Sequence, residues 1–291
     1  MKDKTKGVIL MLISALFFAL MASAVKWTED LPLMQKIFFR DTIGFIVSVI
    51  LIKKSRIPFK GNNVPFLILR SLIGFSAIVL YFYAISKLYL ADASILENTN
   101  PFFIILFSFI FLKENIKKYQ IATLVIGFLG ALLVIKPQFN YTIVPSIMGL
   151  ASGVFAGAAY TIVRYLSKTD YPQTIIFYFT ATSLLITLPF LFMGHFIAPT
   201  LIQWIGLICI ALSAATAQFL ITNAYRYAPA SELSIYNYTQ ILFALFLGML
   251  FWSEIPDLLS LTGGVLIVLS GYINYRYSRD KQPIEQTLES R

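Results

Sequence analysis

The sequence has very little of the chemistry that disulfides and metal sites need. Cys209 is the only cysteine and His195 the only histidine among the 291 residues. A disulfide within one chain needs two cysteines, and a protein-bound zinc ion needs three or four Cys, His or carboxylate ligands. We therefore expect no disulfide framework, no metal site and no cofactor.

Charged residues are also scarce. Asp, Glu, Lys and Arg make up 13% of the chain, whereas 58% of it is hydrophobic. Soluble domains carry about 25% charged residues. The apolar residues run in stretches of about 20, the length that an α-helix needs to cross a bilayer, whereas the strands of a membrane β-barrel would alternate over about 10 residues. The composition predicts an all-α integral membrane protein.

Motifs for binding nucleotides or nucleic acids are missing as well. The chain has no Walker-type glycine loop, so we do not expect it to hydrolyse ATP. Its net charge of +9 comes from Lys and Arg in short connections between apolar stretches. This is the pattern of the positive-inside rule, and it indicates orientation in a membrane rather than binding of nucleic acid.

Ten apolar stretches are long enough to be transmembrane helices. They are approximately Gly7–Val25, Leu33–Ile52, Pro65–Ser86, Ala93–Leu112, Tyr119–Ile135, Ser146–Val163, Thr174–Met193, Leu201–Ala224, Leu233–Trp252 and Leu258–Tyr275. With the N-terminus inside, 17 Lys and Arg fall on the inner side and five on the outer side. This asymmetry predicts a multi-pass plasma-membrane protein with both termini in the cytoplasm.

The first stretch has one alternative interpretation. Ala22-Ser23-Ala24 follows a lysine-containing start and an apolar run, as at the cleavage site of a signal peptide. The run is longer than the apolar part of such a peptide. It also has a partner further along the chain, where Ser14 and Phe17 align with Ser152 and Phe155. We therefore favour a helix that is retained.

The stretch from Leu72 to Glu114 recurs in the second half of the chain, from Leu212 to Glu254. Ten of its 43 positions are identical without a gap, among them Thr99 and Thr239. We interpret the match as an internal duplication. Each copy has five stretches, an odd number, so the second copy enters the membrane from the opposite side, as in the inverted repeats of secondary transporters.

The duplication divides the chain into three parts. Residues 1–140 form a first five-helix repeat, residues 141–278 a second one, and residues 279–291 a polar cytoplasmic tail. The predicted fold is thus an all-α membrane protein of ten transmembrane helices in two inverted five-helix repeats. Glu114 and Glu254 end equivalent stretches on opposite sides, and we interpret them as structural or gating groups.

Several short motifs recur in the two copies. They are Tyr83-Ala84-Ile85, Ala91-Asp92-Ala93, Asn100-Pro101-Phe102 and Leu112-Lys113-Glu114 in the first copy, and Asn223-Ala224-Tyr225, Ala230-Ser231-Glu232 and Trp252-Ser253-Glu254 in the second. Together with ten predicted helices, they resemble the EamA family of the drug/metabolite transporter superfamily. The second copy departs from the pattern in having Ile241 where the first has Pro101. The resemblance implies transport but selects no substrate, because such proteins move amino acids, nucleobases, cofactors, sugar phosphates and drugs.

Glu97 is a carboxylate inside a predicted helix, where charge is costly and usually faces a cavity. Asn100 and Pro101 follow at i+3 and i+4 and share its face. The ungapped alignment of the two copies places Asn237 and Gln240 at the positions of Glu97 and Asn100. We expect these side chains to bind substrate between the two repeats, unless the amides only join neighbouring helices. Pro101 is expected to kink the helix, and the kink either frees a carbonyl group for ligand or is merely structural.

Further polar residues are candidates for the same site. Arg40 either binds Glu97 or a substrate carboxylate, or extends to the outer head groups. Asp41, beside it in the sequence, is a further candidate for its charge partner. Arg70 is expected to extend to the inner surface. Gln218 and Tyr83 are predicted to add a hydrogen-bonding group and an aromatic wall.

These residues favour a secondary transporter with alternating access to a central cavity for a small polar metabolite, most simply an amino acid or similar zwitterion. The alternatives are an exchanger or facilitator of a nucleobase, nucleoside or cofactor and, outside the transporters, a membrane channel or sensor or an integral membrane enzyme. An enzyme is not expected, because the carboxylates are scattered. Glu97 could bind a coupled proton. Beyond substrate, protons and the lipid bilayer, no partner is predicted, and the protein would be a monomer or homodimer.

Overall fold

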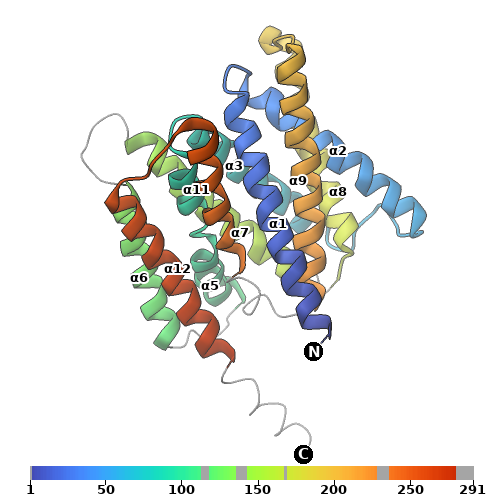
Figure 1. The fold of residues 1–291 in the computed structure, drawn as a ribbon. Coiled ribbons are helices and arrows are strands. Elements are labelled where there is room, and N and C mark those ends of the chain that lie inside the picture. The colour runs from blue at the N-terminus through green and yellow to red at the C-terminus, as the bar shows by residue number, and fades with distance from the viewer. Residues whose placement is uncertain (1, 113–117, 136–142, 167–168, 228–235, 280–291) are drawn as a thin grey trace, which may run out of the picture.

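The computed structural model describes residues 2–112, 118–135, 143–166, 169–227 and 236–279. All regular elements in these ranges are helices, and Figure 1 shows their arrangement. They are α1 (Lys2–Trp27), α2 (Leu33–Lys54), α3 (Val64–Ile85), α4 (Leu90–Glu97), α5 (Asn100–Leu112), α6 (Lys118–Ile135), α7 (Ile143–Leu166), α8 (Pro172–Phe190), the short π-helix η1 (Leu191–His195), α9 (Leu201–Tyr227), α11 (Thr239–Trp252) and α12 (Leu258–Arg279). Pro65 and Pro172 lie at the starts of α3 and α8, where the amide hydrogen that proline lacks has no partner within the helix.

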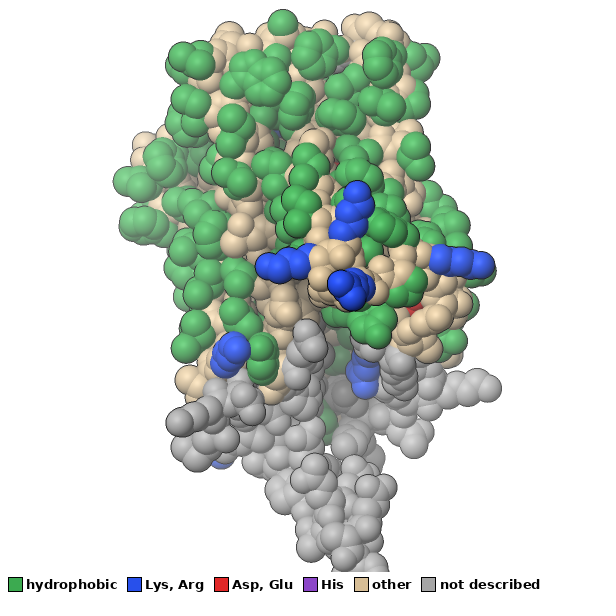
Figure 2. Space-filling view, turned by 90° about the vertical axis from the view of Figure 1, so that its right-hand side faces the viewer, with side chains coloured by type: hydrophobic (Ala, Val, Ile, Leu, Met, Phe, Trp, Pro, Cys, Tyr) green, Lys and Arg blue, Asp and Glu red, His purple; other side chains and the backbone are tan. Residues whose placement is uncertain are grey.

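Within the described ranges, six helical segments are long and apolar enough to cross a membrane. They are Thr5–Trp27, Val64–Ile85, Leu90–Phe111, Ile143–Leu166, Pro172–Gly194 and Leu201–Ala224. Shorter apolar helices cover Ile121–Val134, Thr239–Trp252 and Leu258–Ile273. Large apolar side chains are exposed on them, for example Phe192 at 82% and Leu201 at 79%. Figure 2 shows apolar side chains over most of one face, with Lys and Arg gathered in its lower part. Such a surface suits lipid rather than water.

Helix α2 is long but is not among the six apolar segments, because it contains several charged residues. Lys36, Arg40 and Asp41 all lie within it, and all three are buried. The predicted all-α fold is confirmed for the described residues, and its apolar helices are consistent with a membrane protein, whereas the ten crossings and the inverted repeats stay predictions. Helix α1 begins and α12 ends at the same end of the molecule (Figure 1), as an even number of crossings requires.

The predicted fourth helix is interrupted beside Glu97. Helix α4 ends at Glu97, two residues form a turn, and α5 begins at Asn100. The hydroxyl of Thr99 donates a hydrogen bond of 2.6 Å to the carbonyl oxygen of Leu96, which satisfies one acceptor at the broken end. The expected kink at Pro101 is thus a two-residue interruption that precedes the proline, within one helical segment.

The second half of the chain contains the same turn. Tyr238 interrupts the helical residues that precede α11. The hydroxyl of Thr239 donates to the carbonyl oxygen of Tyr236 at 2.6 Å, at the position that corresponds to the bond of Thr99. Two equivalent positions of the duplicated sequence therefore have the same local structure.

Helices from the two halves of the sequence pack against each other in matching pairs. Helix α1 packs along α9, and α7, the equivalent of α1, packs along α3, the equivalent of α9. The equivalent helices α2 and α8 pack together, as do α6 and α12. When each helix is replaced by its equivalent in the other half, the same helix pairs are obtained.

Two glycines of α7 allow close approach to the helix break. A Cβ atom at Gly153 would lie 2.8 Å from the carbonyl oxygen of Leu96 and 3.1 Å from that of Glu97. A Cβ atom at Gly157 would lie 2.9 Å from the carbonyl oxygen of Asn100. These distances are too short for a residue with a side chain to fit without movement. The two glycines of α7 therefore allow the backbone at Glu97 to lie directly against this helix.

Candidate functional site

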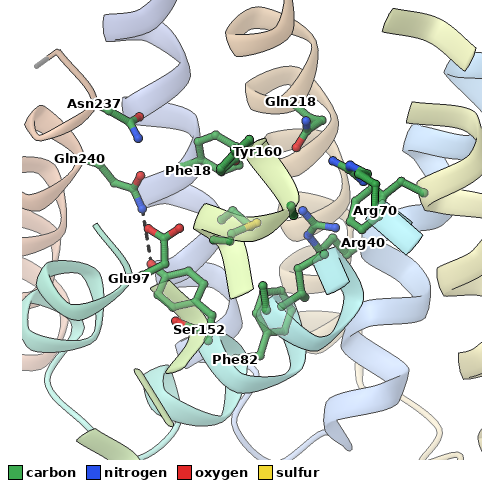
Figure 3. A pocket seen from close by; sticks show the side chains of 18 residues that line it. Phe18, Arg40, Arg70, Phe82, Glu97, Ser152, Tyr160, Gln218, Asn237 and Gln240 are labelled. Atoms are coloured by element: carbon green, nitrogen blue, oxygen red, sulfur yellow. Dashed lines mark hydrogen bonds between the residues drawn. The ribbon is translucent and has the colours of Figure 1, made fainter. Parts of the chain in front are cut away.

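A cavity of about 80 Å³ lies beside the break between α4 and α5, and side chains from both halves of the chain line it (Figure 3). Its polar lining consists of Arg40, Arg70, Tyr81, Glu97, Ser152, Tyr160, Gln218, Asn237 and Gln240. Phe18, Phe82 and Phe179 add aromatic walls. This combination of apolar walls and a few polar groups is typical of small-molecule sites.

One end of the cavity is acidic. Glu97 closes α4, and the negative end of a helix dipole favours a cation there. The Asn100 amide donates to the backbone carbonyl of Glu97 at 2.9 Å and to its carboxylate at 3.3 Å. Beside it, the Gln240 amide donates to the Tyr81 hydroxyl at 3.4 Å, and Ser94 lies 3.3 Å from the same hydroxyl. This end suits a ligand group that is cationic or donates hydrogen bonds.

The other end of the cavity is basic, and Figure 3 shows its two arginines well separated from Glu97. Arg40 forms an ion pair with the adjacent Asp41, and both side chains are buried. Arg70 is also buried, and its Nε and Nη1 atoms have no hydrogen-bond partner among the described residues. Its guanidinium carbon lies 4.0 Å from the centroid of the Phe179 ring, compared with 5.8 Å for Arg40. Two guanidinium groups share one carboxylate, so this end is electropositive.

The structure brings five of the eight predicted site residues to the cavity. They are Arg40, Glu97, Gln218, Asn237 and Gln240. The other three lie outside its lining. Asn100 holds Glu97 by hydrogen bonds, Pro101 is the second residue of α5, and Tyr83 is 37% exposed. Arg40 is paired with Asp41, the neighbouring charge that was one candidate partner. The alternatives of a pair with Glu97 and of extension to the head groups are both wrong, because the Arg40 side chain is buried in that pair.

The expectation that Arg70 reaches the inner surface is also wrong, because its side chain is buried in the cavity wall. It belongs to a helical pattern: Arg70, Gly74, Ala77 and Tyr81 all line the cavity, at i, i+4, i+7 and i+11 of α3. Tyr83, two positions after Tyr81, faces another direction. The helical spacing relates Arg70 to Tyr81, but only the structure shows that this face of α3 lines the cavity.

Glu254 lies apart from the cavity, where it joins three elements of the fold. It forms an ion pair with Lys26 at the end of α1, and each of the two side chains is 10% exposed. Its second oxygen accepts a hydrogen bond of 2.8 Å from the backbone nitrogen of Leu90, and Lys26 donates to the carbonyl oxygen of Leu88 at 2.8 Å. Glu114, its predicted equivalent, lies outside the described residues.

The sequence matches the EamA-like transporter family twice, over residues 5–136 and 144–276. The chain belongs to this family. The resemblance to the drug/metabolite transporter superfamily is thereby confirmed. Membership explains the all-helical membrane architecture and places this chain among transporters rather than among known enzymes.

Relatives across the EamA family cover nearly the whole chain. The pseudopaline exporter CntI of Pseudomonas aeruginosa is 37% identical over 267 residues, which are 91% of this chain and 94% of that protein. Human solute carrier family 35 member G1 is 26% identical over 91% of this chain and 77% of its own. A riboflavin transporter of Brucella anthropi is 24% identical over 86% of this chain and 92% of its own. One solved crystal structure shares the fold, with a TM-score of 0.70 at 14% identity, over 96% of this chain and 99% of its own.

Proposed function

We infer that this EamA protein is a secondary transporter of the plasma membrane, with both termini in the cytoplasm, that gives alternating access to the cavity for an amino acid or a similar zwitterion. The separation of charge across the cavity carries this inference. Glu97 faces one end, and Arg40 and Arg70 face the other. A zwitterion presents an ammonium and a carboxylate group that match both ends, whereas a multiply charged anion would meet the like charge of Glu97.

Two inverted five-helix repeats, residues 1–140 and 141–278, would be the moving parts, followed by a polar tail of residues 279–291. The two family matches, the equivalent turns at Thr99 and Thr239 and the matching helix pairs support this division. In inverted-repeat transporters, the site lies between the repeats at discontinuous helices. Glu97 lies at such a break, with residues of both repeats around it.

The size of the cavity favours a small substrate. Its volume of about 80 Å³ is below the range of about 300–1,000 Å³ that is typical of sites for drug-sized molecules. The alternative is exchange or facilitated diffusion of a larger metabolite such as a nucleobase, nucleoside or cofactor, which the name of the riboflavin transporter suggests. That alternative requires a conformation in which the cavity is wider.

Counterflow into liposomes tests the inference. Liposomes that contain the purified protein and an unlabelled amino acid should accumulate the same labelled amino acid, and nucleosides and cofactors serve as the competing panel. Glu97→Ala should reduce the initial rate at least tenfold, whereas Leu185→Ala, at a side chain that is 73% exposed on the lipid-facing surface, should not. Accumulation of nucleosides or multivalent anions alone would contradict a zwitterion. A lack of counterflow with the entire panel would contradict the transport function.

A further inference from the structure

We propose that the guanidinium group of Arg70, stacked on Phe179, binds the carboxylate of the substrate, and that Arg40 is held by Asp41 as a structural part of the same cluster. This assignment rests on the proposed transport function and narrows its substrates. The cargo must carry a free carboxylate at one end and a group with N–H donors at the other.

Arg70 is a buried cation that forms no ion pair with a carboxylate among the described residues. Its side chain is 4% exposed, and neither Nε nor Nη1 has a hydrogen-bond partner among the described residues. Its neighbour in the cluster, Asp41, is engaged by Arg40 in an ion pair. A buried charge without a counterion is strongly unfavourable, so the site is completed when an anion enters from the cavity.

Phe179 and Gly74 orient this guanidinium group and leave room beside it. The guanidinium carbon lies 4.0 Å from the ring centroid of Phe179, a stacking distance that leaves the N–H edge of Arg70 unobstructed by the ring. Gly74 lies one helical turn further along α3 and has no side chain in front of Nη1, where an added Cβ atom would lie 3.6 Å away. A planar carboxylate can accept two parallel hydrogen bonds from such an edge.

Arg40 shares the burial of Arg70, and its Nε also lacks a hydrogen-bond partner among the described residues, but it differs in two respects. It already forms an ion pair with Asp41, and its guanidinium carbon lies 5.8 Å from the Phe179 centroid rather than 4.0 Å. A substrate carboxylate at Arg40 would have to compete with a buried protein carboxylate for the same donors. Arg70 meets no such competitor, so the carboxylate should prefer it.

The opposite end of the cavity contains acceptors that complement this assignment. Glu97 provides a carboxylate, and Oδ1 of Asn237 is buried without a hydrogen-bond partner in the described part of the chain. Both accept hydrogen bonds, so they suit the ammonium group of an amino acid. The two unsatisfied ends together define a ligand with a carboxylate facing α3 and an amine facing α4 and the start of α11.

Binding to the detergent-solubilised full-length protein tests the assignment, with thermal stabilisation as the readout. The probes are the twenty common amino acids, each compared with its primary amide and with the amine that lacks the carboxylate. The wild-type protein should bind at least one amino acid at least tenfold more tightly than its amide. Arg70→Gln should bind acid and amide equally. Arg70→Lys keeps the charge but loses the planar fork, and should lose at least tenfold in affinity for the acid.

Two controls separate this assignment from its alternatives. The ligand-free melting temperature of each Arg70 variant reports whether it folds, and Leu185→Ala, outside the cavity, should keep the preference for acid over amide. The paired variant Arg40→Gln/Asp41→Asn tests the competing assignment of the carboxylate to Arg40. A preference that survives in both Arg70 variants, or that disappears in the Arg40/Asp41 variant instead, would overturn the assignment, as would a wild-type protein that never prefers the acid. If both Arg70 variants still prefer the acid to its amide and the wild-type protein shows counterflow of that acid, the carboxylate assignment is wrong and the transport function stands. If the wild-type protein prefers the acid but shows no counterflow, the transport function is wrong and the carboxylate site stands.

Discussion

The ion pair between Lys26 and Glu254 should keep one end of the cavity closed. It joins the end of α1 to the residues that follow α11. Lys26 also donates to the carbonyl oxygen of Leu88, before α4, and Glu254 accepts from the backbone nitrogen of Leu90, the first residue of α4. Because α1 begins at the end of the molecule where α12 ends, Lys26 lies at the opposite end from the termini. Removing the carboxylate of Glu254 should therefore open the cavity toward that opposite end.

The expected effect is large because this contact is mostly buried. Each side chain is only 10% exposed, and removing one partner of a buried ion pair costs about 3–5 kcal/mol, since the other charge stays buried alone. The backbone N–H of Leu90 would also lose its acceptor, which costs about 1 kcal/mol more. If only the closed conformation contains the contact, a loss of about 3 kcal/mol already shifts the equilibrium about 100-fold toward the open one.

Cysteine labelling measures this shift directly, because the chain has a single native cysteine. In a Cys209→Ser background, Ala77→Cys places a thiol in the cavity wall. Adding Glu254→Ala should raise its reaction rate with a membrane-impermeant maleimide at least tenfold from the side opposite the termini. Lys87→Met removes a charge from the nearby connection and is the matched control. A rate that changes less than twofold, or an equal effect of Lys87→Met, would refute the closing role of the pair.

Three further results are expected. Arg40→Gln should destabilise the protein by about 3–5 kcal/mol, because Asp41 stays buried without its partner. In thermal unfolding, Arg40→Gln/Asp41→Asn should recover most of that loss, and the absence of recovery would contradict the structural role of the pair. Gly153→Val should cost at least about 1–3 kcal/mol, since its Cβ would lie 2.8 Å from the carbonyl oxygen of Leu96; an unchanged yield and melting temperature would contradict that packing. Glu97→Gln should make uptake into liposomes insensitive to a pH gradient if Glu97 carries a coupled proton, and an unchanged response would exclude that role.

The helices could be predicted from the sequence because a membrane helix is defined by apolar length. The stretch Leu201–Ala224 was predicted from its residues alone, and α9 runs from Leu201 to Tyr227. The meeting of Glu97, Asn237 and Gln240 at one cavity could also be predicted, although they come from different halves of the chain. Equivalent positions of two copies come together when the copies face each other, so the duplication contains this long-range information.

Other features depend on contacts between distant parts of the chain. Pro101 predicts a disturbance of its helix, but the interruption beside Glu97 also involves two further features. The Thr99 hydroxyl donates to the Leu96 carbonyl oxygen, and Gly153 approaches the backbone closely. Arg70 illustrates a second limit. Position along a helix gives depth in the membrane, whereas the direction of the side chain around the helix depends on neighbours that the local sequence does not specify.

The distribution of charge in the cavity suggests how a substrate would promote the change of conformation. At the basic end, Arg40 and Arg70 exceed Asp41 by one positive charge, and at the other end Glu97 provides one negative charge. An empty cavity that closes must remove both excess charges from water without a partner, which is costly. A zwitterion neutralises each end, so it stabilises the closed conformation relative to the open one, and only such a difference in affinity can shift the equilibrium. A ligand that reaches Arg70 but lacks an amine would leave Glu97 unpaired, and should bind without being carried across the membrane.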